Sequence, residues 1–314
     1  MSALLAAAAA PAGPLRWLSS FLYNRRGLYL ALLLAPPLFW LGVVYCGSLL
    51  SLLASSFFGM DEFTGMIRRE FTLRNFVDLA APANLDVIVR TVAMATAVTL
   101  GCAVIGFPIA YYMARYTRGA LRAAFYLGVM LPLWSSYLVR VYAWKLLLAK
   151  EGVVNWVFAQ TGMSWLLEAL LSVPVIGGPS LSISTLGTFI VFVYIWLPFM
   201  ILPIQAALER VPQSLLDASA DLGARDTATF WKVIFPLALP GIVAGSIFTF
   251  SLTLGDYIIP GIIGDSSMFI GQVVFLQQGT AGNVPLAAAF TIVPIAVMAV
   301  YLTVARRMGA FDAL

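Results

Sequence analysis

The sequence predicts an all-α membrane protein with six transmembrane helices. Hydrophobic residues make up 61% of the 314 residues and charged residues only 10%, whereas a soluble domain carries about 25% charged residues. Apolar runs of about 20 residues recur along the chain, and each is long enough to cross a bilayer as a helix. The net charge of +4 does not indicate nucleic acid, because most basic residues flank these apolar runs.

The six predicted spans are apolar runs bounded by polar or charged residues. In order along the chain they cover residues 28–57, 87–114, 121–148, 183–208, 240–263 and 285–305. Proline lacks a backbone N–H and kinks a helix. We therefore expect kinks at Pro36 and Pro37 in the first span, and at Pro198 and Pro203 in the fourth.

Basic residues predict the orientation, because cytoplasmic loops carry an excess of lysine and arginine. Eleven lie on the side that both termini share: Arg16, Arg25, Arg26, Arg115, Arg118, Arg122, Arg210, Arg225, Lys232, Arg306 and Arg307. Five lie on the other side, diluted by acidic residues: Arg68, Arg69, Arg74, Lys145 and Lys150. Both termini are therefore predicted to be cytoplasmic.

The chain divides accordingly into an N-terminal tail (1–27), a six-span membrane domain (28–308) and a C-terminal tail (309–314). The alanine-rich start, MSALLAAAAAPAGP, lacks a basic region, and its apolar part is short. We expect a poorly ordered tail there rather than a cleaved signal peptide.

Three segments are predicted to lie on the outer side of the membrane, opposite the cytoplasm. Residues 59–86 are mixed in charge. Residues 150–182 contain EGVVNWVFAQTG and SWLLEALLS, which suit short helices on the membrane surface. Residues 264–284 are polar and glycine-rich with an apolar centre. Asp86 and Arg90, four residues apart at the outer start of the second span, are expected to form an ion pair.

A charged run, LLDASADLGARDTATFWKVIFPLALPG, separates the fourth and fifth spans. Pro212 can begin a helix, since the first turn needs no donor from it. QSLLDASADL then reads as about three turns, and Gly223 interrupts them. Asp226 or Thr227 is expected to cap a second helix, TATFWKVIF, after which Pro236 leads into the fifth span. We expect a helix–glycine–helix elbow on the cytoplasmic side.

This elbow combines small side chains with a few charges. They are Ala218, Ser219, Ala220 and Ala224, with Asp217, Asp221, Arg225 and Asp226. Small side chains allow another backbone to approach closely, and charges at the rim fix its orientation. An ordinary solvated loop would explain the same charges, so residue chemistry alone leaves both interpretations open.

The sequence lacks the usual machinery of an enzyme. It has no histidine, the commonest general base, and its two cysteines, Cys46 and Cys102, lie in apolar runs without metal-like or disulfide-like spacing. We find no catalytic residues, no metal site and no G-x-x-x-x-G-K-[ST] phosphate loop.

The segment DASADLGARDTATFWKVIFP resembles the EAA signature of the permease subunits of bacterial binding-protein-dependent ABC importers. That signature reads Glu-Ala-Ala, three residues, glycine, then a hydrophobic stretch ending near Leu-Pro. The matching positions are Asp217, Ala218, Ser219, Gly223 and Pro236. Aspartate replaces glutamate, serine replaces the second alanine, and Phe235 replaces leucine. These departures keep the acidity and the small size.

Two further segments, LPLWSSYLVRVYAWKLLLAKEGVVN and LGDYIIPGIIGDSSMFIGQVV, resemble the spermidine/putrescine-type branch of that superfamily, and specifically the first of its two permease subunits. Together, the similar segments and the spacing between them cover most of the chain from about Ile88 onward. The resemblance implies the type I ABC importer (MetI-like) fold, with a cytoplasmic coupling helix in the loop between spans four and five, at about residues 209–236.

What the family implies is a multi-subunit importer of the bacterial inner membrane. The expected partners are a second homologous permease, a cytoplasmic ATPase dimer that binds ATP and Mg, and a periplasmic solute-binding protein. This chain itself would hold no cofactor. The elbow would dock into a cleft of the ATPase, and closure of the ATPase pair would swing the spans. We expect the docking residues to be Asp217, Ala218, Ser219, Gly223, Ala224, Arg225, Asp226 and Phe230.

Asp256 is the main candidate for the substrate path. It lies about 24 Å along a straight helix from Pro240, and a carboxylate inside a membrane usually faces a cavity or a partner. Gly255 and Pro260 suggest a broken helix there. A cation would also need aromatic faces, for which the candidates are Tyr257, Trp134 and Tyr137, with Tyr194 and Trp196 as further pore residues.

Other interpretations stay open at this point. Asp256 could instead lie near the interface, paired with an arginine or capping a backbone, and Arg140 is expected to snorkel to the surface. The expected cargo is a polyamine (putrescine or spermidine) or a related small amino compound. The alternatives are another cargo such as 4-aminobutyrate, an opine or an oxyanion, or an ion-coupled secondary transporter.

Overall fold

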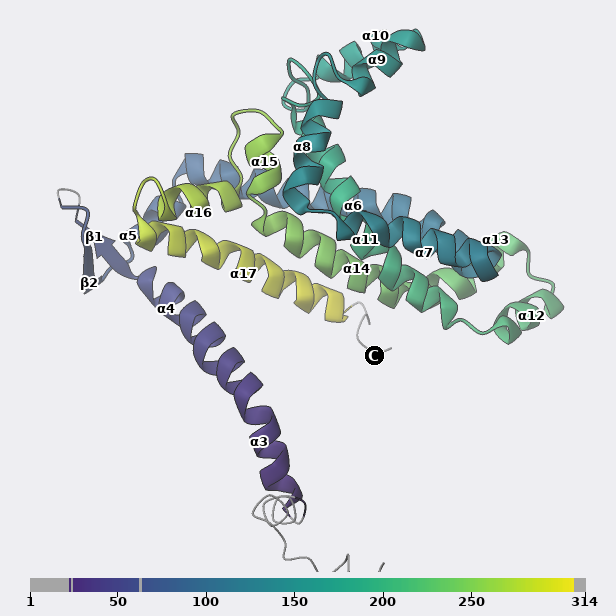
Figure 1. Cartoon of the computed structure of the whole chain (residues 1–314), viewed down its shortest axis with the longest axis horizontal. Helices are drawn as coiled ribbons and strands as arrows, with labels where there is room; N and C mark the ends of the chain where they lie inside the picture. Colours follow the sequence, from purple (N-terminus) through teal and green to yellow (C-terminus); the bar gives the residue numbers. More distant parts are fainter. Residues whose placement is uncertain (1–22, 24, 62–63, 308–314) are drawn as a thin grey trace, which may run out of the picture. The chain divides into compact units, whose positions relative to one another are not determined.

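The computed structural model describes residues 23, 25–61 and 64–307 (Figure 1). The chain separates into two units, Met1–Ser55 and Ser56–Leu314, which we describe one at a time. The predicted C-terminal tail and nearly all of the N-terminal tail lie outside the described residues.

From Arg26 to Ser55, the described part of the first unit is one long apolar helix. It consists of α3 (Arg26–Phe39), a π-helical segment η2 (Trp40–Cys46) and α4 (Gly47–Ser55). Pro36 and Pro37 lie inside α3, and the helix continues past them. The hydrogen-bonding pattern changes to the wider π form from Trp40, a local change that often accompanies strain in a helix.

The second unit begins with a small hairpin and continues as helices. Strand β1 (Phe58–Met60) pairs antiparallel with β2 (Ile67–Phe71), with Met60 opposite Ile67. The helices are α5 (Arg74–Leu79), α6 (Pro82–Tyr116), α7 (Gly119–Trp134), α8 (Tyr137–Leu147), α9 (Val153–Gln160), α10 (Ser164–Leu171), α11 (Thr185–Glu209), α12 (Gln213–Asp221), α13 (Asp226–Thr229), η3 (Phe230–Ile234), α14 (Phe235–Gly255), α15 (Ile258–Ile262), α16 (Ile270–Gln278) and α17 (Val284–Arg307).

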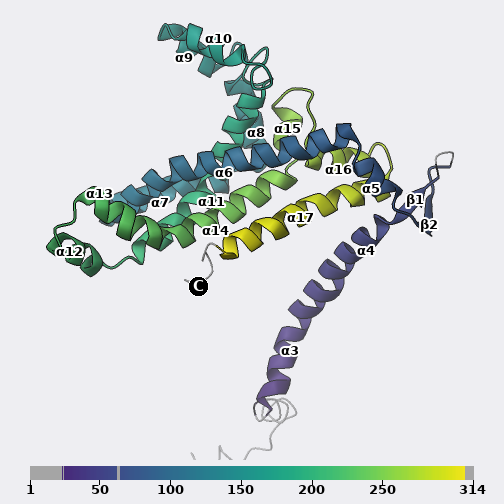
Figure 2. The same cartoon turned by 180° about the vertical axis from the view of Figure 1, so that it is seen from behind.

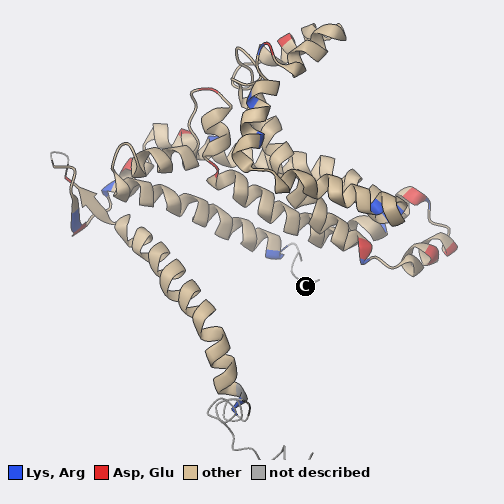
Figure 3. Cartoon of the chain, in the orientation of Figure 1, with Lys and Arg blue, Asp and Glu red and all other residues tan. Residues whose placement is uncertain are grey.

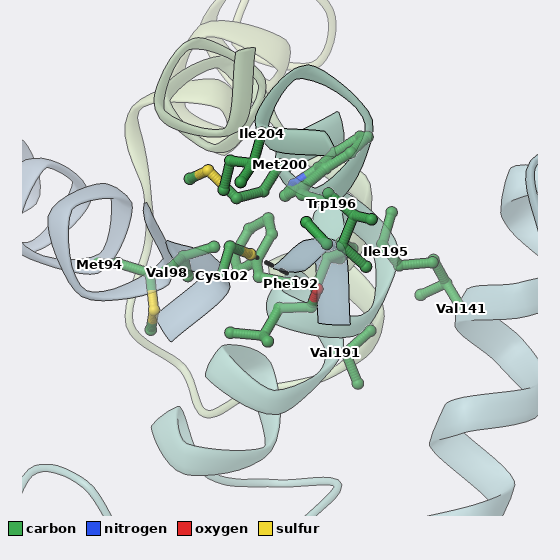
Figure 4. Packing of buried hydrophobic residues seen from close by; sticks show 14 of the residues in the cluster. Met94, Val98, Cys102, Val141, Val191, Phe192, Ile195, Trp196, Met200 and Ile204 are labelled. Atoms are coloured by element: carbon green, nitrogen blue, oxygen red, sulfur yellow. Dashed lines mark hydrogen bonds between the residues drawn. The ribbon is translucent and has the colours of Figure 1, made fainter. Parts of the chain in front are cut away.

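Helices α6, α11 and α14 pack against one another, and α17 packs against α14 and α16 (Figures 1 and 2). Figure 4 shows the core between α6 and α11, where Val98 and Cys102 meet Phe192 and Ile195. The Cys102 thiol donates to the carbonyl oxygen of Val193 at 3.6 Å. Its hydrogen-bond partner is therefore a backbone group of the neighbouring helix.

The predicted membrane fold is confirmed in outline. Within the described residues, five helices are long and apolar enough to cross a membrane, and the bent pair α7 and α8 makes a sixth span if counted as one. The two short helices predicted between spans three and four are also present, as α9 and α10.

The third span is not the continuous helix that the apolar run predicts. Helix α7 ends at Trp134, α8 begins at Tyr137, and the two are bent by 96°. Ser135 and Ser136 between them are extended, and the Ser135 hydroxyl donates to the carbonyl oxygen of Pro132 at 2.8 Å. A serine side chain that bonds locally competes with the helical ladder, which accounts for the break.

The fifth span differs from its prediction at both ends. It starts at Asp226 and runs as one 30-residue helix to Gly255, so Pro236 does not separate the elbow from the span. A π-helical segment, η3, comes immediately before α14, and a proline near the start of a new turn loses little. At the other end the helix stops at Gly255, and the short α15 follows after Asp256 and Tyr257.

Close contact between α11 and α14 depends on two glycines in the sequence GIVAG. A side-chain carbon added at Gly241 would lie 2.5 Å from the Pro203 carbonyl oxygen, and one added at Gly245 would lie 3.0 Å from the Cα atom of Met200. Small residues spaced in this way let helix backbones approach in a membrane, where packing replaces the hydrophobic effect as the main attraction.

We predict that Gly245→Val destabilises the fold, because the new side chain meets the backbone of α11. Overpacking of this kind costs about 1–3 kcal/mol or more. Thermal unfolding of the detergent-solubilised protein measures it. The matched control is Gly128→Val on α7, where a side-chain carbon meets nothing within 4 Å. Equal midpoints for the two variants would contradict the packing argument.

Candidate functional site

The elbow predicted between spans four and five is formed by α12 and α13. Helix α12 ends in a left-handed turn at Gly223, whose φ is +73°. The Gly223 N–H donates to the Ala220 carbonyl at 2.8 Å, and the Ala224 N–H donates to the Ser219 carbonyl at 3.1 Å. These two bonds define a Schellman motif. Apart from its chain neighbours, no atom of the described residues lies within 4 Å of a side-chain carbon placed at Gly223. Glycine is therefore required by the positive φ of the backbone and not by a lack of room for a side chain.

The start of α13 corrects one prediction. Arg225, rather than Asp226 or Thr227, occupies the N-cap position, and no side chain caps the helix. Asp226 lies in the first turn, where a carboxylate interacts favourably with the helix dipole. A hydrogen bond of 2.9 Å between the hydroxyls of Ser219 and Thr229 joins α12 to α13. The two short helices are thus held at a defined angle.

The outer face of the elbow is exposed and partly acidic. Figure 3 shows acidic positions on both α12 and α13, at one end of the helical bundle. Of the predicted docking residues, Asp217, Ala218 and Gly223 are exposed, whereas Ser219 and Ala224 are half-buried. Leu222, which the sequence analysis did not single out, is 88% exposed at the tip. The sequence pattern that could have indicated Leu222 is a large apolar residue immediately before the glycine of a charged turn.

Phe230 lies on the inner side of the elbow, away from this exposed face. Its ring meets Phe107 at 5.7 Å and Tyr111 at 5.9 Å between centroids, both nearly edge-on. Both partners belong to α6. Edge-to-face aromatic contacts add to the energy of burial. Phe230 therefore anchors the elbow to the helical bundle.

A polar cluster beside the elbow was not anticipated. Glu209, at the end of α11, forms an ion pair with Arg122 of α7. Its Oε1 atom also accepts hydrogen bonds of 2.9 Å from the Tyr126 hydroxyl and from the Gln205 amide. The partners on α7 are more than 80 residues away in sequence, so no local pattern announces them. This cluster ties α7 to the inner end of α11.

A second candidate region surrounds Asp256 at the break after α14. Its Oδ1 atom accepts from the backbone N–H groups of Ile258 at 2.7 Å and Ile259 at 3.0 Å, which caps α15. Its Oδ2 atom accepts from the Tyr137 hydroxyl. A cavity of about 360 Å³ opens here, lined by Tyr137, Trp196, Ser251, Leu252, Gly255, Asp256, Tyr257 and Ile258. Asp256 therefore both caps a backbone and lines a cavity.

Aromatic rings form much of the wall of this cavity. The ring of Tyr137 stacks on Trp196, with centroids 5.9 Å apart, and Tyr257 stacks on Phe275 at 4.8 Å. Trp196 is only 8% exposed. Its Nε1–H has no hydrogen-bond partner among the described residues. Ring faces and a carboxylate together favour a cationic ligand.

Arg140 is half-buried and lies beside Tyr137. Its guanidinium carbon is 5.9 Å from the centre of the Tyr137 ring. Its Nε and Nη1 atoms are buried, with no hydrogen-bond partner in the described part of the chain.

Four of the six predicted path residues come together in the cavity: Asp256, Tyr257, Tyr137 and Trp196. Two do not. Trp134 ends α7 and is 73% exposed, and Tyr194 packs against Trp144 with centroids 4.9 Å apart. At the outer start of α6, the predicted ion pair between Arg90 and Asp86 is confirmed. In the described ranges, no three histidine, cysteine, aspartate or glutamate residues are grouped so as to hold a metal.

The chain is similar to known transport proteins. Residues 103–311 match the family described as binding-protein-dependent transport system inner membrane component. Over 296 residues the chain is 58% identical to the inner membrane ABC transporter permease protein YdcU of Escherichia coli (strain K12), covering 94% of this chain and 95% of that protein. It is 31% identical over 260 residues to the spermidine/putrescine transport system permease protein PotB of the same organism, covering 82% and 90%.

Two solved structures share the fold. A bacterial ABC transporter involved in the import of the acidic polysaccharide alginate aligns with a TM-score of 0.66 at 15% identity, covering 92% of this chain and 98% of that one. The inward-facing MetNI methionine ABC transporter aligns with a TM-score of 0.53 at 17% identity, covering 71% and 93%. At these identities the alignments concern the fold alone.

We predict that Phe230→Ala loosens the elbow while leaving the bundle folded. Truncating a fully buried phenylalanine costs about 3–5 kcal/mol, and about 1–3 kcal/mol is expected for this half-buried ring. Hydrogen exchange at the amides of residues 213–225 measures the effect and should become roughly tenfold faster or more. Trp231→Ala is the control, because that neighbouring side chain is 63% exposed. Equal exchange in both variants would rule out Phe230 as the anchor.

Proposed function

This chain belongs to the family of binding-protein-dependent transport system inner membrane components, and we propose that it forms the path for a polyamine or a related small amino compound. As a permease subunit of an ABC importer it is a membrane component and not an enzyme. The observation that carries the cargo proposal is the cavity at Asp256, where a carboxylate lies among aromatic rings.

The chemistry of this cavity suits an ammonium group. Such a group donates charge-assisted hydrogen bonds to a carboxylate and is attracted to aromatic faces. Asp256 supplies the carboxylate, and Tyr137 and Tyr257 supply two of the faces. The 31% identity to a protein named as a spermidine/putrescine permease supports the same cargo class. Putrescine and spermidine are the polyamines we propose.

A second cargo, 4-aminobutyrate, is favoured by one observation. The Arg140 guanidinium lies against the Tyr137 ring and so brings a positive charge close to the cavity. That charge repels a dication but would attract the carboxylate end of an amino acid. The uptake experiment below therefore includes this compound as a competitor.

The elbow is proposed to be the site at which a cytoplasmic ATPase acts on this chain. Asp217, Ala218 and Leu222 form an exposed surface with an apolar tip and an acidic rim. Ser219, Gly223, Ala224, Arg225 and Asp226 shape the turn behind it. The second helix of the elbow is the start of the 30-residue helix that ends at Gly255. A displacement of the elbow would thus travel about 45 Å along one helix to Asp256.

The proposed assembly places this chain in the bacterial inner membrane with both termini in the cytoplasm. The ATPase dimer binds ATP and Mg and docks at the elbow. A second, homologous permease completes the path. A periplasmic solute-binding protein delivers cargo at the opposite end of the bundle, where Figure 1 shows α5 and the β1–β2 hairpin.

We predict that Gly223→Pro uncouples transport from ATP hydrolysis. Proline cannot adopt the φ of +73° and has no N–H for the Ala220 carbonyl, so the elbow loses its shape. Uptake in cells should fall about tenfold or more, the factor that corresponds to a coupling loss of about 1.4 kcal/mol. The reconstituted complex should still hydrolyse ATP.

The control for this variant is Gly162→Pro. Gly162 ends α9 in the same hydrogen-bonding motif, with a φ of +70° and bonds to Ala159 and, through Met163, to Phe158. Gly162→Pro therefore disrupts the same kind of glycine turn at a place outside the elbow. Normal uptake with Gly223→Pro, or an equal loss with Gly162→Pro, would reject the elbow as the coupling site.

We predict that cells lacking this chain regain uptake of labelled putrescine or spermidine when it is restored, because the cavity presents a carboxylate to the cargo. Unlabelled polyamines should compete, and unlabelled 4-aminobutyrate should not. Restoration with Asp256→Asn should fail, since the amide lacks the charge. Restored uptake of 4-aminobutyrate alone would replace the polyamine proposal with the second cargo.

A further inference from the structure

The Tyr137 hydroxyl donates a hydrogen bond to the carboxylate of Asp256, the group that the proposed cargo would bind. Oδ1 of Asp256 accepts two backbone hydrogen bonds, from Ile258 at 2.7 Å and Ile259 at 3.0 Å. Oδ2 accepts from Tyr137. We propose that Tyr137 is an internal competitor of the cargo at Asp256, and that it lowers the affinity of every cargo by the same factor, so that only a donor stronger than a hydroxyl is held. This inference rests on the proposed function.

The requirement for charge follows from the exchange of one donor for another. A cargo that binds Oδ2 must displace the tyrosine hydroxyl, so only the difference between the two hydrogen bonds contributes to affinity. Both donors form a charge-assisted hydrogen bond with the carboxylate, but an ammonium group adds the attraction between two opposite charges, which a hydroxyl lacks. A hydroxyl or amide of the cargo merely replaces one neutral donor by another and gains little.

The Tyr137 bond is not needed to hold the broken helix. The backbone groups freed at the break are capped through Oδ1, whereas Tyr137 uses Oδ2. Losing the hydroxyl therefore leaves the cap of α15 in place. The Tyr137 ring keeps its stacking contact with Trp196 after substitution by phenylalanine. Tyr137→Phe should therefore remove the hydrogen bond to the Asp256 carboxylate and leave the fold unchanged.

The backbone around Tyr137 lets this competitor move. Tyr137 is the first residue of α8, directly after the extended Ser135 and Ser136. A hinge of two extended residues allows α8 to shift without breaking a helical hydrogen bond. Asp256 instead follows the end of α14, the helix that begins at the elbow. Relative movement of α8 and α14 would make or break the bond between Tyr137 and Asp256.

The experiment uses the complete importer in nanodiscs, without its binding protein. Binding of labelled putrescine is measured alone and in competition with 1,4-butanediol, which has the same carbon chain with neutral hydroxyls in place of the ammonium groups. The variants are Tyr137→Phe, Asp256→Asn and the control Tyr194→Phe. Tyr194 packs on Trp144, outside the cavity, and loses the same hydroxyl.

Tyr137→Phe should bind putrescine about ten- to a hundredfold more tightly than the wild type, the range expected when a competing hydrogen bond to a charged group is removed. Butanediol should also bind more tightly, by about the same factor, because neither compound any longer has to displace the hydroxyl. Asp256→Asn should lose the preference for the charged compound. Tyr194→Phe should match the wild type in both measurements.

Weaker putrescine binding by Tyr137→Phe would make Tyr137 a cargo ligand and overturn the proposal. Unchanged putrescine affinity, or a change equal to that of Tyr194→Phe, would also overturn it. Failure of the cargo proposal looks different, because the wild type would then bind no polyamine. In that case 4-aminobutyrate and 4-hydroxybutyrate, which differ only in ammonium against hydroxyl, test the role of Tyr137 in the same way.

Discussion

The contact between α11 and α14 supports the rest of this structure. Gly241 and Gly245 bring α14 against the backbone of α11 at Pro203 and Met200, and α6 and α17 pack around that pair. Within a bilayer the lipid tails are as apolar as the side chains, so close approach of backbones, rather than exclusion of water, holds helices together. The elbow and Asp256 are the two ends of the helix positioned in this way, and their geometry depends on it.

Hydrogen bonding at broken helices is the second constraint, because backbone groups inside a membrane must find partners within the protein. Two breaks meet at one cavity: Ser135–Ser136 before α8, and Asp256–Tyr257 after α14. Asp256 satisfies the backbone with one oxygen and leaves the other for Tyr137. A structural role and a role in the path are therefore compatible, since they use different atoms of the same carboxylate.

Predictions from the sequence succeeded where the structure depends on residues close together in the chain. They failed where it depends on the direction in which a helix runs or on contacts between residues far apart in the sequence. The elbow was predicted because a glycine between two short helical runs has one common conformation, which Gly223 adopts. The third span was predicted as continuous because hydropathy reports that residues are apolar and not that the chain turns by 96°. Pro236 was expected to lead from the second helix of the elbow into a separate fifth span, but the two form one helix from Asp226 to Gly255.

The sequence alone determined six apolar runs, the basic residues that flank them and the turn at Gly223. Each of these features depends only on residues that are neighbours in the chain. The sequence named candidate aromatic residues for the path but could not say which of them would contact Asp256, because the Tyr137 that bonds it is 119 residues away. The anchoring of Phe230 by α6 and the cluster around Glu209 are of the same kind. Such pairs arise only when helices pack, because packing brings together side chains that no spacing along the sequence relates.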